Sequence, residues 1–300
     1  MGLFKKLTEN KLFESVNNAQ QAIKTTGKLI SLISDNKVSA SVREMLQGLK
    51  TILTEKPNIN SINHFINHFL LQISPENQPI IIKELLEVFH ERWKNVDRKT
   101  AEVALKTYDF ADKTILVHGN DIAITALVEN LNVNLKTCNI IQIISLHDKI
   151  GKQQASKIAE IGIPVTVIDD SAIANYIQEV DVVLMGNEIA MYETFIGKTG
   201  SYNLCVIAQY FKKPVYILSD TRKILNKKYF PASVVDMFIG KNKKPIVEIW
   251  KDAPENININ YIHLEEIPNS LVTKFIFEND AFTPNELEDE VEKTMVVKFI

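Results

Sequence analysis

Residues 181–202, which read DVVLMGNEIAMYETFIGKTGSY, decide the fold. A short apolar run ends at Gly186, a carboxylate follows at Glu188, and a glycine-rich turn at 197–202 opens a helical pattern. Short β-rich runs of this kind alternate with helical segments along the second half of the chain, which indicates a parallel sheet covered by helices on both faces. Such sheets bind ligands at the carboxyl ends of their strands. We therefore expect Gly186, Asn187 and Glu188 to lie at a ligand site.

The first part of the chain has a different period. Residues 1–112 carry apolar side chains at every third or fourth position, which is typical of packed helices, and one long helix is expected from Pro79 to Phe110. Residues 113–300 carry the alternating pattern and end in an acidic helix begun by Pro284. The expected fold class is therefore α/β, with an N-terminal helical domain at 1–112 and a doubly wound, mainly parallel Rossmann-like domain at 113–300.

The composition indicates the class of protein and of partner. The net charge is −3, so no general basic field suggests direct nucleic-acid binding. Cys138 and Cys205 have no metal-type spacing and indicate a reducing compartment, and Cys205 is expected to be a core thiol inside an apolar helix. No apolar run approaches the roughly 20 residues of a membrane span, and the N-terminus does not read as a secretory signal. We expect a cytoplasmic protein with no membrane partner.

Two predicted strand ends carry candidate ligand groups. The strand TILVH at 114–118 is followed by Gly119, Asn120 and Asp121, where a glycine lets a ligand approach the backbone and a helix N-terminus attracts an anion. An ordinary turn capped by Asp121 explains the same residues. At the second strand end, Glu188 is sheltered by apolar neighbours and could act as a general base with a raised pKa, or be a polar loop residue.

Two further patterns could bind a phosphate or a metal. Residues 197–201 combine glycines, Lys198 and the backbone amides of a helix start, which suits a phosphate although the P-loop spacing is absent. A flexible glycine loop with a solvated lysine is the alternative. His64 and His68 share a helix face as zinc ligands do, but no third ligand lies nearby and helix packing explains them as well. We expect no metal and no cofactor.

Several motifs together resemble one known family. Residues 186–218 resemble a block, G-A-D-x-I then N-K-x-G-T-Y, shared by initiation factor 2B regulatory subunits and the methylthioribose-1-phosphate and ribose-1,5-bisphosphate isomerases. KTILVHGND at 113–121 resembles the family's strand ending in T-H, and GIPVTVIDDSA at 162–172 its G-I-x-V-T-x-I-x-D-S-A segment. The stretch 267–287 resembles its closing P-x-x-L-I-T-x-F-I-T-E-x-G-x-x-x-P. This resemblance implies the same layout, helices followed by a doubly wound domain.

The departures from that family concern its catalytic groups. The isomerases resemble one another in using a cysteine after the T-H strand and the aspartate of G-A-D, and these positions are Gly119 and Glu188 here. Arginines of the family are replaced by Lys56 and His147, and an asparagine by Gly197. Because a missing acid or base typically costs about 10²- to 10⁴-fold in rate, the resemblance implies a protein without the usual isomerase activity.

The leading hypothesis is an initiation-factor-2B-like homo-oligomer that binds a phosphorylated sugar or nucleotide as a regulator, with a translation factor as a further partner implied by the resemblance. The expected ligand-binding residues are Lys56, Gly119, Asn120, Asp121, His147, Asn187, Lys198 and Ser201. One alternative is a sugar-phosphate aldose-ketose isomerase with an altered site, in which Glu188 is the base and Asp121 or a water supplies the second proton transfer. The other alternative is a structural interaction protein with no ligand.

Overall fold

The computed structural model describes residues 79–145, 149–226, 253–257 and 262–293. Four residues that the sequence singled out lie outside these ranges, namely Lys56, His64, His68 and His147. The chain divides into two compact units, Met1–Val96 with Met295–Ile300, and Asp97–Thr294. The domain boundary expected after residue 112 stays a prediction, because residues 1–78 are not among those described.

The described part of the first unit is one helix, α5 (Pro79–Trp93), in which the rings of Phe89 and Trp93 lie 6.2 Å apart. The prediction of a single long helix beyond Pro79 is wrong, because a second helix, α6 (Val96–Thr107), starts separately. The backbone N–H of Lys94 donates to His90 O at 2.8 Å and closes the last turn of α5. Asn95 follows, and the side chain of asparagine competes with the helical backbone for hydrogen bonds.

The second unit is built on a seven-stranded sheet with the order β10-β9-β7-β4-β1-β2-β3. Every neighbouring pair runs parallel except β10 and β9, which are antiparallel. The strands are β1 (Thr114–His118), β2 (Asn139–Ile143), β3 (Val165–Ile168), β4 (Val182–Gly186), β7 (Val215–Leu218), β9 (Lys274–Ile276) and β10 (Ala281–Phe282). The predicted α/β class with a mainly parallel sheet is confirmed.

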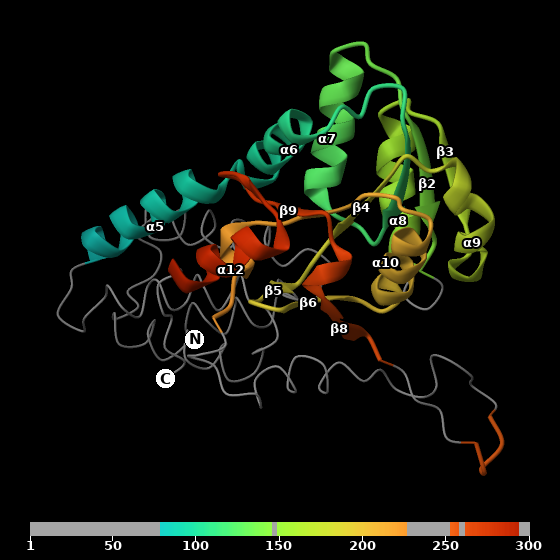
Figure 1. The fold of residues 1–300 in the computed structure, drawn as a ribbon. Helices are drawn as coiled ribbons and strands as arrows, with labels where there is room; N and C mark the ends of the chain where they lie inside the picture. The colour runs from blue at the N-terminus through green and yellow to red at the C-terminus, as the bar shows by residue number, and fades with distance from the viewer. Residues whose placement is uncertain (1–78, 146–148, 227–252, 258–261, 294–300) are drawn as a thin grey trace. The chain divides into compact units, whose positions relative to one another are not determined.

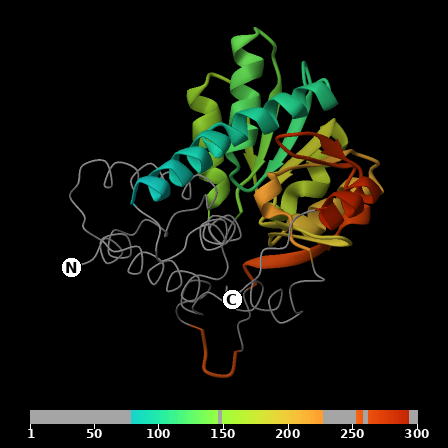
Figure 2. The same ribbon diagram turned by 90° about the vertical axis from the view of Figure 1, so that its left-hand side faces the viewer.

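Helices cover both faces of this sheet (Figures 1 and 2). On one face, α6, α7 (Ile122–Val133) and α8 (Ile150–Glu160) bury a core with the inward side chains of β1. On the other face lie α9 (Ile173–Tyr176), α10 (Ser201–Tyr210) and the predicted acidic helix α12 (Pro284–Lys293). Cys205 of α10 is fully buried in this second core, as expected, and burial, with the charge of Glu265, raises its pKa to about 12. Single 3₁₀ turns lie at η1 (Asp170–Ala172), η2 (Ile177–Glu179), η3 (Thr221–Lys223) and η6 (Asn269–Leu271).

A small antiparallel sheet, which the sequence did not predict, extends from the end of β4. It has the order β5-β6-β8, with β5 (Ile189–Ala190), β6 (Thr194–Lys198) and β8 (Leu264–Pro268). The register pairs Gly197 with Glu265 and Lys198 with Leu264. This pairing brings the segment 263–265 next to the glycine-rich turn that precedes α10.

The order of the strands creates a switch point between β1 and β4. From β1 the chain proceeds through β2 to β3 on one side, and then returns to β4 and β7 on the other. His118 pairs with Met185, so Gly119 and Gly186 follow at neighbouring positions of the carboxyl edge. A crevice at such a point is where open α/β sheets bind ligands. Within the described ranges, no helix is long and apolar enough to cross a bilayer.

Candidate functional site at the carboxyl edge of the sheet

Asp121 lies over the end of β4. Its Oδ1 accepts the backbone N–H of Ala123 at 2.8 Å, which confirms it as the cap of α7, and its own N–H donates to Gln154 Oε1 at 2.7 Å. A Cβ at Gly186 would overlap Asp121 Oδ2 and lie 3.1 Å from its Cγ. A glycine is therefore needed at position 186 so that the carboxyl of Asp121 can approach the strand that leads to Glu188.

Glu188 and Lys198, two predicted site residues, form an ion pair. Glu188 Oε1 lies 3.3 Å from Lys198 Nζ, and the same ammonium lies 3.1 Å from Nε2 of His263. Because Lys198 can only donate, the His263 ring accepts through Nε2. The side chains of Glu188 and Lys198 are 22% and 25% exposed, so the pair is open to solvent on one side.

The pKa of Glu188 is lower than the sequence suggested. Burial raises it, but the positive charges of Lys198 and Lys223 outweigh burial and hold the pKa below the usual range of a glutamate. The prediction of a raised pKa at Glu188 is therefore wrong. The pKa was mispredicted because both lysines come from outside the strand that leads to Glu188, and Lys223 follows β7, which neighbours β4 in the sheet but is distant from it in sequence. Glu188 is a carboxylate at neutral pH.

Three other carboxyls join Glu188 around Lys223, and we call these four the acid cluster: Asp97, Asp121, Glu188 and Asp220. Burial raises the pKa of Asp121, against the charge of Lys223. Burial, with the charges of Asp121 and Asp220, raises the pKa of Asp97 to about 7. For Lys223 burial lowers the pKa, but the four carboxylates raise it overall. The cluster thus contains neighbouring carboxyls with lowered and raised pKa values.

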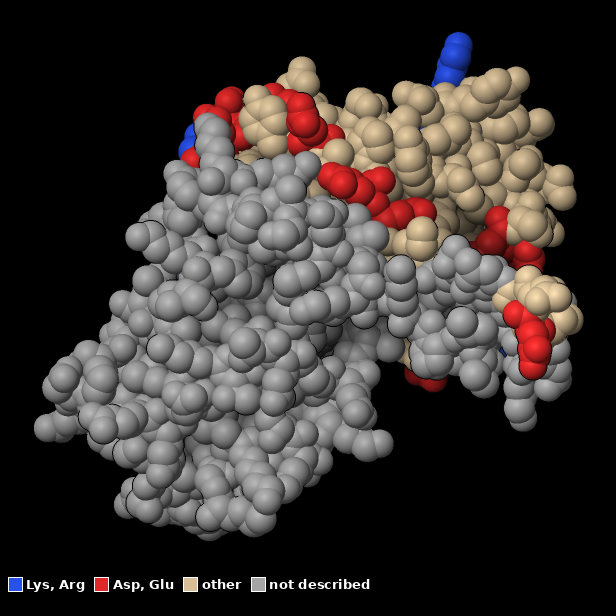
Figure 3. Space-filling view, turned by 90° about the horizontal axis from the view of Figure 1, so that it is seen from below, with Lys and Arg blue, Asp and Glu red and all other residues tan. Residues whose placement is uncertain are grey.

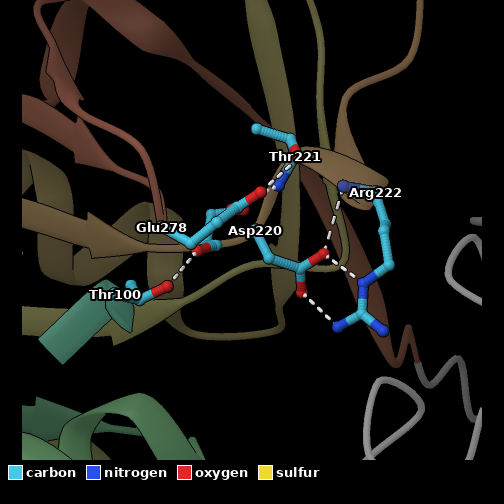
Figure 4. A network of polar contacts seen from close by, with 6 residues as sticks. Thr100, Asp220, Thr221, Arg222 and Glu278 are labelled. Atoms are coloured by element: carbon cyan, nitrogen blue, oxygen red, sulfur yellow. Dashed lines mark hydrogen bonds and ion pairs between the residues drawn. The ribbon is translucent and has the colours of Figure 1, made fainter. Parts of the chain in front are cut away.

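The carboxyl end of β7 is closed by a network of strong polar contacts (Figure 4). Arg222 Nε and Nη2 donate to Asp220 Oδ1 and Oδ2 at 2.7 and 3.0 Å, which is bidentate geometry. The backbone N–H of Thr221 donates to Glu278 Oε2 at 3.0 Å. Arg222 is 1% and Asp220 4% exposed, so this ion pair is removed from water. Burial raises the pKa of Asp220, but Arg222 and Lys223 lower it overall.

Sequence reasoning missed the residues at this strand end. Thr100 of α6 also belongs to it, because its hydroxyl donates to Ser219 O at 3.1 Å (Figure 4). The signal was present in the segment 219–223, which reads SDTRK directly after the buried strand VYIL. The same rule that selected Glu188, a polar residue following a parallel strand, selects Asp220 and Lys223.

Ser201 begins α10 and its hydroxyl is engaged by the protein. Ser201 Oγ lies 3.1 Å from Nδ1 of His118, and both side chains are buried. The preceding Gly200 has φ 99°, a conformation that favours glycine, and a Cβ there would lie only 3.3 Å from His118 Nε2. Glycine at 200 therefore lets the turn pass close to the histidine ring.

The backbone amides at the start of α10 already hold a carboxylate. Glu265 Oε1 accepts the N–H of Tyr202 at 2.6 Å, and the N–H groups of Gly200 and Ser201 bond to the same side chain. Burial raises the pKa of Glu265, and the three amides act against that rise. The sequence offered these amides as a phosphate site, but in this conformation an internal anion occupies it.

Asn120 and Gly119 are both predicted ligand residues, but the side chain of Asn120 is hydrogen-bonded within the protein whereas the space beside Gly119 is open. The side chain of Asn120 is held by α8, because its Nδ2 donates to Gln153 Oε1 at 3.2 Å and Lys157 Nζ donates to its Oδ1 at 3.1 Å. Gly119 has φ 85°, and no described atom lies within 4 Å of the point where a Cβ would be. The space beside the end of β1 is therefore open.

Polar side chains without a hydrogen-bond partner among the described residues follow three strands of this edge. They are Ser145 after β2, Asn187 after β4 and Ser219 after β7, with 8%, 5% and 4% exposure. A buried polar atom that stays unpaired costs about 1–3 kcal/mol, and in native sites such atoms commonly meet water or a ligand. Because β2, β1, β4 and β7 are neighbours, these atoms mark one continuous edge.

The described surface on the face that Figure 3 shows is mainly uncharged or acidic. There the described residues display several groups of acidic side chains and almost no lysine or arginine. No three histidine, cysteine, aspartate or glutamate side chains within the described ranges form a set that could hold a metal ion. Among the cations that act on the acid cluster are Lys198, Lys223 and Arg222, and Arg222 is paired with Asp220.

Comparisons with known proteins place this chain in a family. The alpha subunit of translation initiation factor eIF2B from Dictyostelium discoideum is 29% identical over 219 residues, covering 68% of this chain and 67% of that protein. Ribose 1,5-bisphosphate isomerase from Archaeoglobus fulgidus is 27% identical over 222 residues, covering 72% and 69%. The structure of 5-methylthioribose 1-phosphate isomerase from Pyrococcus horikoshii OT3 superposes with a TM-score of 0.75 at 15% identity, covering 97% and 86% of the two chains.

The family model matches nearly the whole sequence. The Initiation factor 2 subunit family covers residues 8–284, which include every strand of the central sheet and both partners of the Glu188–Lys198 pair. The resemblance inferred from the motifs is thereby confirmed. Its relatives include both a regulatory translation factor subunit and isomerases. This chain belongs to the Initiation factor 2 subunit family.

Proposed function

We propose that this protein binds a small phosphorylated sugar or nucleotide at the carboxyl edge of its sheet and acts as a regulatory, non-catalytic member of its family. The observation that supports this most is Asn187, whose buried amide follows β4 at the switch point with no partner among the described residues. The hydroxyls of a sugar supply partners for Asn187, Ser145 and Ser219, whose side chains have none among the described residues. Lys198 supplies positive charge for a phosphate.

The relatives support the same class of ligand. The Archaeoglobus fulgidus protein is named for ribose 1,5-bisphosphate, and the Pyrococcus horikoshii structure for 5-methylthioribose 1-phosphate. Position 119, where the resemblance implies a cysteine in the isomerases, is a glycine here, so this position offers no group for proton transfer. Binding without turnover is what remains when the polar edge is kept and that group is lost. Lys56 and His147 are proposed ligand residues on the resemblance alone.

A thermal shift assay tests this proposal. Ribose 1,5-bisphosphate, methylthioribose 1-phosphate, AMP and GMP are compared with unphosphorylated ribose, and a ligand at 100 times its Kd adds about 2.7 kcal/mol of stability. The variant Asn187→Ala is expected to lose the shift, whereas Asn203→Ala, on the exposed side of α10, keeps it. No shift with any phosphorylated compound at millimolar concentration contradicts the proposal and favours a structural protein without a ligand.

The second candidate function is a sugar-phosphate aldose-ketose isomerase. The pKa of Asp121 is raised and that of Glu188 is lowered. These opposite shifts favour an isomerase, because a carboxyl that holds its proton beside one that is ionised can act as an acid and a base. In these substrates C1 carries the phosphate, so Asp121 gives its proton to the ring oxygen as the bond from C1 to that oxygen breaks, and Glu188 removes the proton from C2 to form an enol. Glu188 then returns its proton to C1 while the C2 hydroxyl gives its proton to Asp121 and becomes the ketone, so both carboxyls are restored and no cofactor is needed.

Direct incubation separates the two candidates. Purified protein with ribose 1,5-bisphosphate or methylthioribose 1-phosphate is assayed for ketose, and the leading proposal expects none. Ketose formation that disappears in Glu188→Gln and persists in Glu193→Gln, at an exposed position away from the acid cluster, contradicts the non-catalytic proposal. A further loss in Asp121→Asn assigns the second proton to Asp121.

Assembly and location belong to the same proposal. The match to a translation factor subunit supports a homo-oligomer that pairs through its α/β domains, a translation factor as partner, and action in the cytoplasm. Light scattering on the purified chain gives its mass directly. A monomer at micromolar concentration contradicts the oligomeric part of the proposal without affecting ligand binding.

A further inference from the structure

Glu188 occupies the place that an anionic ligand would need. Its carboxylate lies 3.3 Å from Lys198 Nζ, and the charge of Lys223 acts on it as well. These are the two lysines whose charges lower the pKa of Glu188. A phosphate that approached either ammonium would therefore meet a carboxylate of the same sign.

The other positions at this edge that attract anions are filled in the same way. Glu265 accepts the amides at the start of α10, and Asp121 accepts an amide at the start of α7. These two carboxyls are held by backbone N–H groups, which cannot move without unwinding a helix. The carboxylate of Glu188 pairs with the flexible side chain of Lys198, and both are partly exposed, so rotation of either side chain separates this pair. Open space beside Gly119 lies at the same edge, as does the amide of Asn187, which has no partner among the described residues.

We propose that Glu188 is the internal counter-ion of an anion site at Lys198, in the positive field of Lys223, and that a ligand phosphate binds there by displacing Glu188. This inference rests on the proposed function, because it concerns the same ligand edge. Displacement makes the site selective. Inorganic phosphate gains only the two lysines and must replace an anion that already neutralises them. A phosphate attached to a sugar brings hydroxyls that bond to Asn187, and these added bonds drive Glu188 away.

Phosphate titrations of the full chain test this inference. Calorimetry or ³¹P NMR at constant ionic strength measures the Kd of inorganic phosphate for the wild type and for Glu188→Gln, which keeps the shape and removes the charge. Glu188→Gln is expected to bind phosphate at least ~10-fold more tightly, because a like charge is removed from the site. Glu188→Asp keeps the charge and should stay near the wild type, and Glu193→Gln controls for loss of one negative charge elsewhere. In Glu188→Gln/Lys198→Met the gain should vanish.

The outcomes separate this inference from the proposed function. Equal or weaker phosphate binding by Glu188→Gln, or an equal gain in Glu188→Asp or Glu193→Gln, overturns the counter-ion role even if sugar phosphates bind. Tighter binding of inorganic phosphate by Glu188→Gln alone supports the counter-ion role. If, in addition, no phosphorylated sugar or nucleotide raises the unfolding temperature of the wild type, the proposed function is contradicted while the counter-ion role stands. Thermal unfolding of each variant shows that the fold is retained.

Discussion

The carboxyl ends of β7 and β4 lie next to each other in one sheet and are treated in opposite ways. After β7, Asp220 and Arg222 form a bidentate ion pair that is almost completely buried. After β4, Glu188 makes a 3.3 Å ion pair with Lys198 that is partly exposed, and Asn187 has a buried amide without a partner among the described residues. The ion pair after β7 joins buried parts of the fold, whereas the polar groups after β4 are partly exposed or have no partner among the described residues.

The largest expected effect on stability comes from breaking the buried ion pair of Asp220 and Arg222 after β7. Arg222→Met leaves the carboxylate of Asp220 buried without its guanidinium partner, and removal of one member of such a pair costs about 3–5 kcal/mol. Urea unfolding measures the loss. Lys293→Met, which removes the 3.7 Å ion pair with Glu290 on α12, is the control, because the Lys293 side chain is 72% exposed and should contribute little. Similar losses in the two variants would mean that burial does not distinguish these ion pairs.

The next largest expected effect on stability comes from filling the space beside Gly186, at the carboxyl end of β4. Gly186→Ala adds a methyl group that overlaps the carboxyl of Asp121, and overpacking of this kind costs about 1–3 kcal/mol. In an Asp121→Ser background the same substitution should cost clearly less, because the overlapping atoms are gone. Unfolding free energies of the four chains form a double-mutant cycle. An equal cost in both backgrounds contradicts the close approach of Asp121 to β4.

The pH dependence of stability tests the acid cluster between the two ends. Burial, with the charges of Asp121 and Asp220, raises the pKa of Asp97 to about 7, whereas an aspartate in the unfolded chain has a pKa of about 3.9. The folded state therefore holds this proton more tightly, and stability falls as the pH rises from 4 through 7. Asp97→Asn removes this loss, so its advantage over the wild type should be on the order of 2 kcal/mol greater at pH 8 than at pH 5.

Unfolding at the two pH values measures this difference for Asp97→Asn. The matched control is Glu102→Gln on the same helix, whose side chain is exposed. The control is expected to change stability equally at pH 5 and pH 8. A pH-independent effect of Asp97→Asn would show that Asp97 ionises as an ordinary surface carboxyl.

The smallest expected effect on stability is at Lys198. Lys198→Met breaks a partly exposed ion pair, which typically contributes less than about 1 kcal/mol to stability. The same variant should lose most of the thermal shift caused by a phosphorylated ligand, because its ammonium is the proposed phosphate partner. A large loss of stability with ligand binding retained would reverse the roles assigned to the two strand ends.

Alternation of apolar runs with helical segments was enough to predict the central sheet, because parallel strands buried on both faces read as short continuous apolar runs. It was not enough to predict the break at Lys94 and Asn95, since the apolar spacing continues across it. The small sheet of β5, β6 and β8 was also missed. Its pairing joins segments about 70 residues apart, and no local pattern around Gly197 specifies Glu265 as its neighbour.

The sequence predicted where several residues of the candidate site lie, but it did not predict how their charges shift the pKa values. Strand ends selected Asp121, Asn187, Glu188 and the turn with Lys198, and the structure brings Glu188 and Lys198 within 3.3 Å. The direction of the pKa shift at Glu188 required knowledge of Lys223, which arrives from another strand. Charges from distant segments combine only in the folded chain, so the pKa of a site residue follows from the topology rather than from its sequence neighbours.

The pairing of β6 with β8 also sets the time at which the site is completed during synthesis. A nascent chain that has emerged through Leu218 contains five parallel strands of the central sheet, in the sheet order β3-β2-β1-β4-β7. His263 lies 65 positions after its partner Lys198 and has not yet emerged at that point. Because domains fold as the polypeptide leaves the ribosome, the central sheet can form while the amides of α10 still await Glu265. A tethered intermediate of this kind has its scaffold before its candidate site is complete.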